Sequence, residues 1–314
     1  MQANLKAKNN TLYMKYNTLT IKKLSLVLMA TSFIFVGCGG GDDIETTETS
    51  DTEKTDSAKT TLLTVNGEIF SIPSPIQTAI LVKQVGANYD KALLNDPKNY
   101  SNYSTKFQKA LNLGVYGADL GYVTMYEQTQ DAIGYLASVR KLADELGVSG
   151  AFDLSLVDRF EKNMGNRDTI LSLVSEAYRA SDSYLKNNER DDLGALVLAG
   201  GWVESIYFAT NVAKVSKNEE VIKRIGEQKK TIENLIKMLS PYYNNSEFTS
   251  FIDSLIDLAG DFDNIKFIYI YEKPTTDVEN KVTTINSRTE VSITEDQLKT
   301  ISEKIAKIRK SIVG

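Results

Sequence analysis

Two apolar stretches of the sequence carry the side chains that could do chemistry. Each has a carboxylate followed three residues later by a tyrosine, and this spacing places both side chains on one face of a helix. A buried carboxylate costs several kcal/mol unless it is paired or hydrogen-bonded. The candidate ligand-binding residues are Asp119, Tyr122 and Tyr126 in residues 111–128, and Trp202, Glu204 and Tyr207 in residues 193–210.

Three hypotheses for these residues stay open. The first is a polar network in the core, in which a tyrosine hydroxyl or an arginine satisfies each carboxylate and the helix register is fixed. The second is a pocket for a small ligand such as a sugar or a peptide. The third is an acid/base pair of Asp119 and Glu204, as glycosidases use. No motif that pairs a nucleophile with a base is present, so the sequence predicts no catalytic residue.

Composition narrows the chemistry further. The chain has no histidine and one cysteine. It therefore lacks the commonest metal ligand and the commonest general acid/base. It also cannot form an intrachain disulfide, a cysteine-rich zinc site or an iron–sulfur cluster. We expect neither a metal site nor a cofactor.

Both stretches are apolar nearly all round, so each is predicted to be a central, buried helix. Glycine inside a helix costs about 1 kcal/mol relative to alanine, so something must offset the glycines found here. Either two helices approach closely at these positions, or the backbone contacts a ligand directly. The small residues at helical spacing are Ala110, Gly114, Gly117 and Gly121 in the first stretch, and Gly194, Gly201 and Ser205 in the second.

The surrounding pattern places these two helices in a mainly α domain over residues 61–314. Apolar periodicity predicts further helices on both sides. The expected fold is a multi-helix bundle or an array of helical hairpins, with small β-hairpin elements near the N- and C-terminal ends. The predicted helices cover residues 75–86, 104–126, 129–146, 153–163, 167–187, 192–215, 218–239 and 247–264.

The β elements are predicted from turn residues and alternation. Apolar runs on either side of Asn66-Gly67 predict a hairpin before the first helix. Residues 267–271 are aromatic and β-branched, and residues 281–293 alternate and turn near Asn286-Ser287. This pattern predicts a small sheet at about 267–293.

The last predicted element is a basic amphipathic helix. Thr294 and Gln297 form a capping-box pattern at its start, and it runs to about Val313. We expect its lysines to be solvated on a packed helix rather than to bind a partner.

The N-terminal pattern is that of an exported, lipid-anchored protein. Residues 24–36 are apolar but too few to span a membrane, which takes about 20 residues. Two lysines precede this run and Gly37-Cys38 follows it, as in a secretory signal. The string FVGC resembles a lipobox, where bacteria attach lipid to a cysteine and cleave before it, although a phenylalanine replaces the preferred aliphatic residue. Residues 1–37 are therefore predicted to contain a lipoprotein signal peptide, with translation starting at Met14 and palmitate on Cys38. The alternative is a plain signal peptide.

The segment that follows is acidic. Residues 38–60 hold seven acidic residues, two lysines and few apolar ones, so we predict a disordered tether. Its start, Asp42-Asp43-Ile44-Glu45, resembles a surface-export signal of Bacteroidota lipoproteins, and generic linker acidity is the alternative. Residues 1–37 carry five lysines and no acid, so their removal takes the net charge from −5 to about −10. That charge argues against a nucleic-acid partner.

Several longer strings together resemble a family of uncharacterised lipoproteins from Bacteroidota. The resemblance covers most of residues 68–314 and implies a lipid anchor and a mostly helical exported domain. It implies no particular activity, substrate or cofactor. The strings are SIPSP (71–75), LNLGVYGADLGY (111–122), EKNMGN (161–166), LAGGWVES (198–205) and KPTTDVENKVTTINS (273–287).

These observations predict a lipid-anchored protein of the outer membrane, facing the periplasm or the cell surface, with a binding or structural role rather than an enzymatic one. The lipid on Cys38 is its expected contact with the membrane, and its expected partner is a small molecule, a glycan or a protein. The alternative is a carboxylate-based hydrolase acting on envelope glycans or peptides. Accessible carboxylates about 5–10 Å apart in one cleft would favour that alternative, and buried, hydrogen-bonded ones would count against it.

Overall fold

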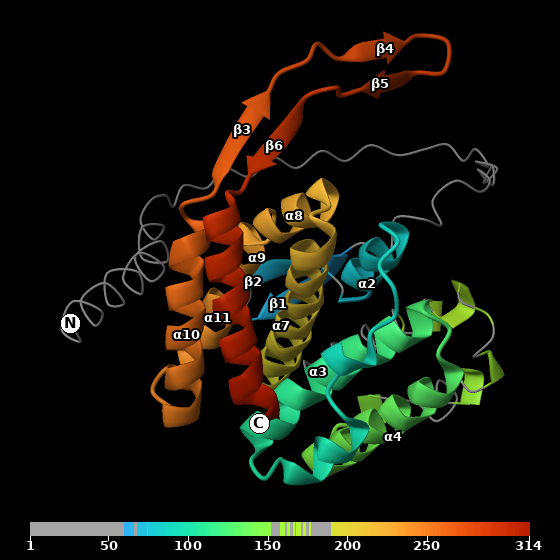
Figure 1. Cartoon of the computed structure of the whole chain (residues 1–314), viewed down its shortest axis with the longest axis vertical. Helices are drawn as coiled ribbons and strands as arrows, with labels where there is room; N and C mark the ends of the chain where they lie inside the picture. Colours follow the sequence, from blue (N-terminus) through green and yellow to red (C-terminus); the bar gives the residue numbers. More distant parts are fainter. Residues whose placement is uncertain are drawn as a thin grey trace, which may run out of the picture. The chain divides into compact units, whose positions relative to one another are not determined.

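The computed structural model describes residues 60–65, 68–73, 75–151 and 190–314, with short pieces between residues 158 and 176. The predictions for the signal peptide, Cys38, nearly all of the tether and most of the helices at 153–163 and 167–187 lie outside these residues. The described part is mainly α-helical, as predicted, and carries small two-stranded antiparallel sheets (Figure 1).

The elements follow the chain in a simple order. The main helices are α2 (Pro75–Gln84), α3 (Lys106–Met125), α4 (Thr129–Leu146), α7 (Asp191–Ser216), α8 (Glu219–Gly226), α9 (Lys229–Leu239), α10 (Ser246–Phe262) and α11 (Glu295–Val313). Short 3-10 turns are η2 (Lys91–Leu93), η3 (Pro97–Asn102), η4 (Ser149–Ala151) and η5 (Ser240–Tyr242). The strands are β1 (Thr60–Val65), β2 (Glu68–Pro73), β3 (Lys266–Ile270), β4 (Thr275–Asp277), β5 (Val282–Thr284) and β6 (Arg288–Ser292).

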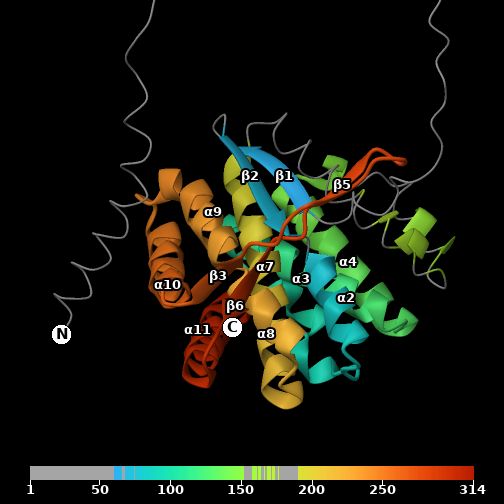
Figure 2. The same ribbon diagram turned by 90° about the horizontal axis from the view of Figure 1, so that it is seen from above.

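Helix α7 lies at the centre of the helices, and α3 packs against it (Figures 1 and 2). Helices α2, α8, α9 and α11 also contact α7, which explains why its sequence is apolar nearly all round. By length and hydropathy alone α7 could cross a membrane, but 78% of its most apolar window is buried inside the protein. The prediction that residues 111–128 and 193–210 contain central, buried helices is confirmed.

Glycines allow α3 and α7 to approach closely. A Cβ at Gly114 would overlap a carbonyl oxygen of α7 and stand 2.7 Å from the backbone nitrogen of Gly201. A Cβ at Gly200 would likewise overlap a carbonyl oxygen of α3. The hypothesis that two helices approach closely is therefore confirmed for Gly114 and Gly201. Gly200 makes a further close contact that the sequence analysis did not predict. Gly121 differs, because a Cβ there would make only an ordinary contact with Ile76 at 3.6 Å.

The single helix predicted over residues 218–239 is wrong, because the chain breaks between α8 and α9. Gln228 lies at the break, and its Oε1 accepts a hydrogen bond of 3.1 Å from the indole N–H of Trp202. Both side chains are buried. Gly226, the last residue of α8, leaves room for a side chain of β6. Two tertiary contacts thus fix a bend that helical periodicity does not reveal.

Two helix ends and one hairpin that were predicted from local sequence signals are present in the structure. Gly147 ends α4 in the left-handed conformation, with φ of 70°. Thr294 and Gln297 form the predicted capping box at the start of α11. The N-terminal hairpin is also present, since β1 pairs antiparallel with β2 from Thr60 opposite Pro73 to Val65 opposite Glu68. Its expected turn residues lie outside the described part.

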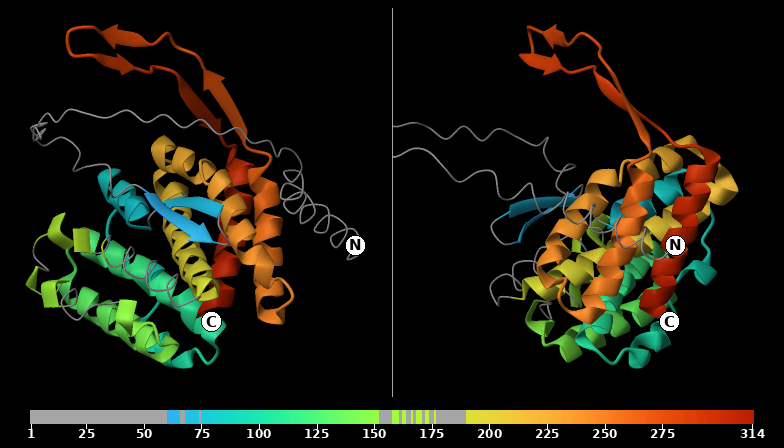
Figure 3. Two further views of the ribbon diagram at one scale, coloured as in Figure 1. Left: turned by 180° about the vertical axis from the view of Figure 1, so that it is seen from behind. Right: turned by 90° about the vertical axis from the view of Figure 1, so that its left-hand side faces the viewer.

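Residues 266–292 form a two-stranded ribbon that projects from the helices (Figures 1 and 3). Strand β3 pairs antiparallel with β6 at its base, and β4 pairs with β5 farther out. We call residues 266–292 the ribbon and the remaining described residues from 75 onward the helical body. The sheet predicted at about 267–293 is confirmed.

The turn predicted near Asn286-Ser287 is wrong. The chain reverses at residues 278–281, where Asp277 Oδ1 accepts hydrogen bonds of 3.1 and 3.0 Å from the backbone N–H groups two and three residues on. The Asn286 amide instead donates across the ribbon to the carbonyl oxygen of Lys273 at 2.8 Å. Asn286, a residue type that favours turns, therefore links the two sides of the ribbon between the β3–β6 pair and the β4–β5 pair and does not form a turn.

Candidate functional site

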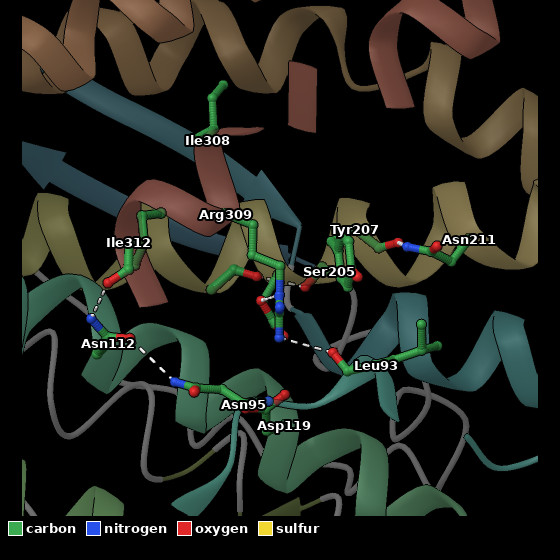
Figure 4. A network of polar contacts seen from close by, with 12 residues as sticks. Leu93, Asn95, Asn112, Asp119, Ser205, Tyr207, Asn211, Ile308, Arg309 and Ile312 are labelled. Carbon is green, nitrogen blue, oxygen red and sulfur yellow. Dashed lines mark hydrogen bonds and ion pairs between the residues drawn. The ribbon is translucent and has the colours of Figure 1, made fainter. Parts of the chain in front are cut away.

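Three side chains from three helices form a buried ionic cluster. Glu204 of α7 and Asp119 of α3 are 0% exposed. Arg309 extends from α11 toward α3, where Asp119 lies (Figure 4). Arg309 donates from Nε to Glu204 Oε2 at 2.7 Å and from Nη2 to Glu204 Oε1 at 2.8 Å. Nη2 also donates to the carbonyl oxygen of Leu93 at 2.9 Å. A two-bond pair of this kind combines charge and geometry and is strong for a carboxylate partner.

Burial raises the pKa of both carboxyl groups of the ionic cluster, but Arg309 acts mainly on one of them. Burial, together with the nearby charge of Glu204, raises the pKa of Asp119 well above its usual range. Burial also raises the pKa of Glu204, and the hydrogen bonds from Arg309 oppose that rise. Because Glu204 holds both bonds from Arg309, the geometry favours ionisation of Glu204 over ionisation of Asp119.

Within the described part of the chain, one carboxyl oxygen of Asp119 has no hydrogen-bond donor. Oδ2 of Asp119 accepts from the backbone N–H of Asn95 at 3.3 Å, but Oδ1 has no donor among the described residues. Glu204, with which Asp119 interacts, can only accept a hydrogen bond when ionised. If Asp119 holds a proton, its carboxyl group can donate to Glu204, and the cluster with Arg309 then carries no net charge.

Amide side chains continue the network toward the C-terminus (Figure 4). Asn95 Nδ2 donates to the Tyr103 hydroxyl at 2.8 Å and to Asn112 Oδ1 at 3.4 Å. Asn112 Nδ2 donates to the carbonyl oxygen of Ile312 at 2.8 Å. The network therefore ties α3 and the segment before it to the last turn of α11.

Tyr122 and Tyr126 hold the connection after α2 rather than face an open pocket. The Tyr122 hydroxyl accepts from the backbone N–H of Asp90 at 3.1 Å, and the Tyr126 hydroxyl donates to the carbonyl oxygen of Ala87 at 2.7 Å. Both rings contact the ring of Tyr89, with centroids 5.7 Å away. Burial raises the pKa of both phenols, so they stay protonated at neutral pH.

Tyr207 and Trp202 have separate surroundings. The guanidinium of Arg309 lies 4.3 Å from the centroid of the Tyr207 ring, a cation–π contact beside the ionic cluster. Trp202 bonds to Gln228 at the α8–α9 break. Of the six predicted ligand-binding residues, the structure thus brings Asp119, Glu204 and Tyr207 together around one arginine.

The condition for the hydrolase hypothesis is not met at these carboxylates. Asp119 and Glu204 are fully buried and interact with each other, so no substrate can lie between them. They line neither the groove described below nor the small hollow beside Thr124. Their geometry matches the core-network hypothesis. Over the described residues, no group of acidic or cysteine side chains could hold a metal ion.

Arg309 is the residue of the cluster that the sequence did not single out. Its helix has an apolar stripe of Ile301, Ile305, Ile308 and Ile312, all buried. Arg309 follows Ile305 by four residues and therefore lies on the same helical face. A cation within an apolar stripe was the available signal that α11 carries a partner for a buried acid.

The ribbon shows the opposite arrangement, with apolar side chains on the outside. Phe267, Tyr269 and Tyr271 are 43%, 67% and 69% exposed. Phe267 and Tyr269 alternate along β3, so they share one face of the ribbon, and Tyr271 follows at the same spacing just after the strand. Further exposed apolar side chains of the ribbon are Ile268, Val278, Val282 and Ile285.

A groove of about 950 Å³ lies where the ribbon joins the helical body. Its walls come from the end of α7, from α8, from β6 and from the start of α11. Four lysines and five acidic residues line it, and one pair, Lys217 and Glu295, is linked at 3.3 Å. Mixed charge gives the groove no clear preference for an anion or a cation.

Comparisons with known proteins found no relative of this chain. No protein-family profile matches the chain, and neither the curated proteins nor the solved structures include a match. The residues and their geometry are therefore the basis for inferring a function.

Proposed function

We propose that the protein is a lipid-anchored envelope protein that binds a protein partner through its ribbon, with the helical body as a non-catalytic support. The observation that carries the proposal is the exposed aromatic row of Phe267, Tyr269 and Tyr271. Contiguous apolar surface with a polar surround marks interaction sites, and aromatic residues are enriched at protein interfaces.

The charge of the ribbon favours a protein over an anionic membrane surface. Residues 266–292 contain four basic and four acidic side chains, so the segment is neutral overall. Segments that bind anionic lipid carry an excess of lysine and arginine. No strand among the described residues pairs with the outer edge of β3 or of β6, so the N–H and C=O groups there can pair with another strand.

The lipid anchor is the second part of the proposal, and the N-terminal pattern supports it. Cys38, the only cysteine, stands at the end of a short apolar run after two lysines. An acidic tether of residues 39–60 would keep the helical body away from an anionic leaflet. The resemblance to Bacteroidota lipoproteins agrees with an outer-membrane location.

Metabolic labelling tests the anchor. Cells fed a clickable palmitate analogue should label the wild-type chain, and Cys38→Ala should abolish the label because no other thiol is present. Equal labelling of both chains would show that the lipobox interpretation is wrong.

Site-specific photo-crosslinking tests the binding role of the ribbon. A photoreactive phenylalanine analogue in place of Tyr269 should give crosslinked protein adducts in intact cells. The matched control is Val215, which is 90% exposed on the helical body. Adducts at both positions, or at neither, would contradict a binding role for the ribbon.

A further inference from the structure

Strand β3 has a free edge with an unusual composition. It pairs with β6 on one side, and no described strand covers its other side. Its residues and the two that follow are exposed or half-buried and hold five consecutive aromatic or β-branched side chains, 267–271. Pro274, which has no N–H, ends the segment that can pair. Proteins normally protect such an edge, because it is a template for pairing with another chain.

Residues 266–272, KFIYIYE, are complementary to themselves in an antiparallel pair. A twofold axis at the central residue places a positive charge opposite a negative one, aromatic opposite aromatic, and isoleucine opposite isoleucine. The opposing pairs are Lys266 with Glu272, Phe267 with Tyr271, Ile268 with Ile270, and Tyr269 with its own copy. Cross-strand pairs of these kinds each stabilise a sheet.

The other edge of the ribbon lacks this complementarity. A twofold axis at the centre of β6 places Glu290 opposite Glu290, and like charges directly opposite each other are destabilising. It also places Arg288 opposite Ser292, which offers no charge partner. The two edges of one ribbon therefore differ, and β3 is the edge suited to a second copy.

We propose that two copies of this chain pair edge to edge through β3, antiparallel about Tyr269, to form a four-stranded sheet. The proposal rests on the proposed binding role of the ribbon and names its partner. Antiparallel pairing places the two helical bodies at opposite ends of that sheet, because each ribbon projects from its own body (Figure 3). The aromatic rows of both copies then form one continuous face. An interface this short is expected to be weak, in the micromolar range.

Disulfide trapping tests the register. Tyr269→Cys places two thiols opposite each other at the axis, and copper phenanthroline in air oxidises them by removing two electrons and two protons. The full chain, extracted in detergent, should run as a covalent dimer on a non-reducing gel. Val278→Cys, at the tip of the same ribbon and 81% exposed, should stay monomeric, as should the wild type. A dimer of Val278→Cys as strong as that of Tyr269→Cys would overturn the proposed register.

Charge reversal tests the pairing without a covalent bond. Lys266→Glu, or Glu272→Lys, places two repelling pairs across the axis and should raise the dimer Kd about tenfold. An equimolar mixture of the two variant chains restores two attractive pairs, so the mixture should associate like the wild type in sedimentation velocity. The mixture also controls for the loss of the Glu272–Arg288 ion pair within one ribbon. Unchanged association of both single variants, or a mixture no better than either, would overturn the proposal.

Comparison with photo-crosslinking at Tyr269 separates the two proposals. A crosslinked species at twice the chain's mass supports both. Adducts with a different protein, together with no disulfide dimer, overturn pairing of copies and leave the binding role of the ribbon intact. No adduct of either kind overturns both.

Discussion

The ionic cluster of the helical body and the ribbon differ in which kinds of side chain they bury. In the body, Asp119, Glu204 and Arg309 are buried and satisfy one another. On the ribbon, aromatic and aliphatic side chains lie in solvent. Charged residues, which often form functional sites, therefore stabilise the fold here. Aromatic and aliphatic residues, which usually form a core, are exposed on the ribbon. The comparison directs functional experiments to the ribbon and stability experiments to the cluster.

Removing the cation should produce the largest loss of stability. Arg309→Met leaves the buried Glu204 carboxylate without its cation, and breaking a buried ion pair in this way costs about 3–5 kcal/mol. Urea unfolding followed by the fluorescence of the single tryptophan, Trp202, measures the change. Lys310→Met is the matched control, because Lys310 is exposed on the same helix and should change little. Glu204→Gln combined with Arg309→Met should recover part of the loss.

The next largest effect should come from the close approach of α3 and α7. Gly200→Ala forces a Cβ against a carbonyl oxygen of α3, and overpacking of this kind costs about 1–3 kcal/mol. Gly260→Ala in α10 has open space, so helix propensity should raise the free energy of unfolding by about 0.5–1 kcal/mol. The same urea melt compares them. Two variants that shift in the same direction would contradict the assignment of Gly200 to backbone contact.

The raised pKa of Asp119 predicts that the stability of the fold depends on pH. The pKa of Asp119 is raised in the folded state, so the folded chain binds this proton more tightly than the unfolded chain, and stability falls as pH rises above about 4. The slope approaches about 1.4 kcal/mol per pH unit until the folded group ionises. Asp119→Asn, which still donates a hydrogen bond to Glu204, should become increasingly stable relative to the wild type over that range. Parallel stability curves for the two chains would show that Asp119 is not protonated.

Substitution on the ribbon should have the smallest effect on stability. Tyr269→Lys and Val278→Lys replace exposed side chains, so each should change the free energy of unfolding by less than about 0.5 kcal/mol. Tyr269→Lys should nevertheless weaken association, and Val278→Lys should not. A loss of stability as large as that of Arg309→Met would mean that the ribbon is part of the cooperative core.

Sequence pattern predicts the helices and their ends where the information is local. Two apolar segments became α3 and α7, and Thr294 with Gln297 marked the start of α11. The break between α8 and α9 escaped prediction because Gln228 is held by Trp202, 26 residues earlier in the chain. Periodicity carries no information about such a contact.

The candidate site was predicted only in part for the same reason. The pattern identified Asp119 and Glu204 as acids that need partners, but their cation comes from residue 309, 105 residues after Glu204. Alternation predicted strands in the ribbon, yet it could not show that most of its apolar side chains stay exposed, because exposure depends on what else packs there. Asp277, which caps the turn, was a local signal that could have been used.

Helix α11 couples its own folding to that of the helices it covers. Its Arg309 neutralises Glu204 in the central helix, and the Ile312 carbonyl oxygen accepts a hydrogen bond from the Asn112 amide. If α11 detaches, an acid is left in the core with no cation beside it, and an unpaired buried charge is strongly destabilising. Local unfolding of α11 should therefore open the contact between α3 and α7 as well, so that the helical body unfolds as one cooperative unit.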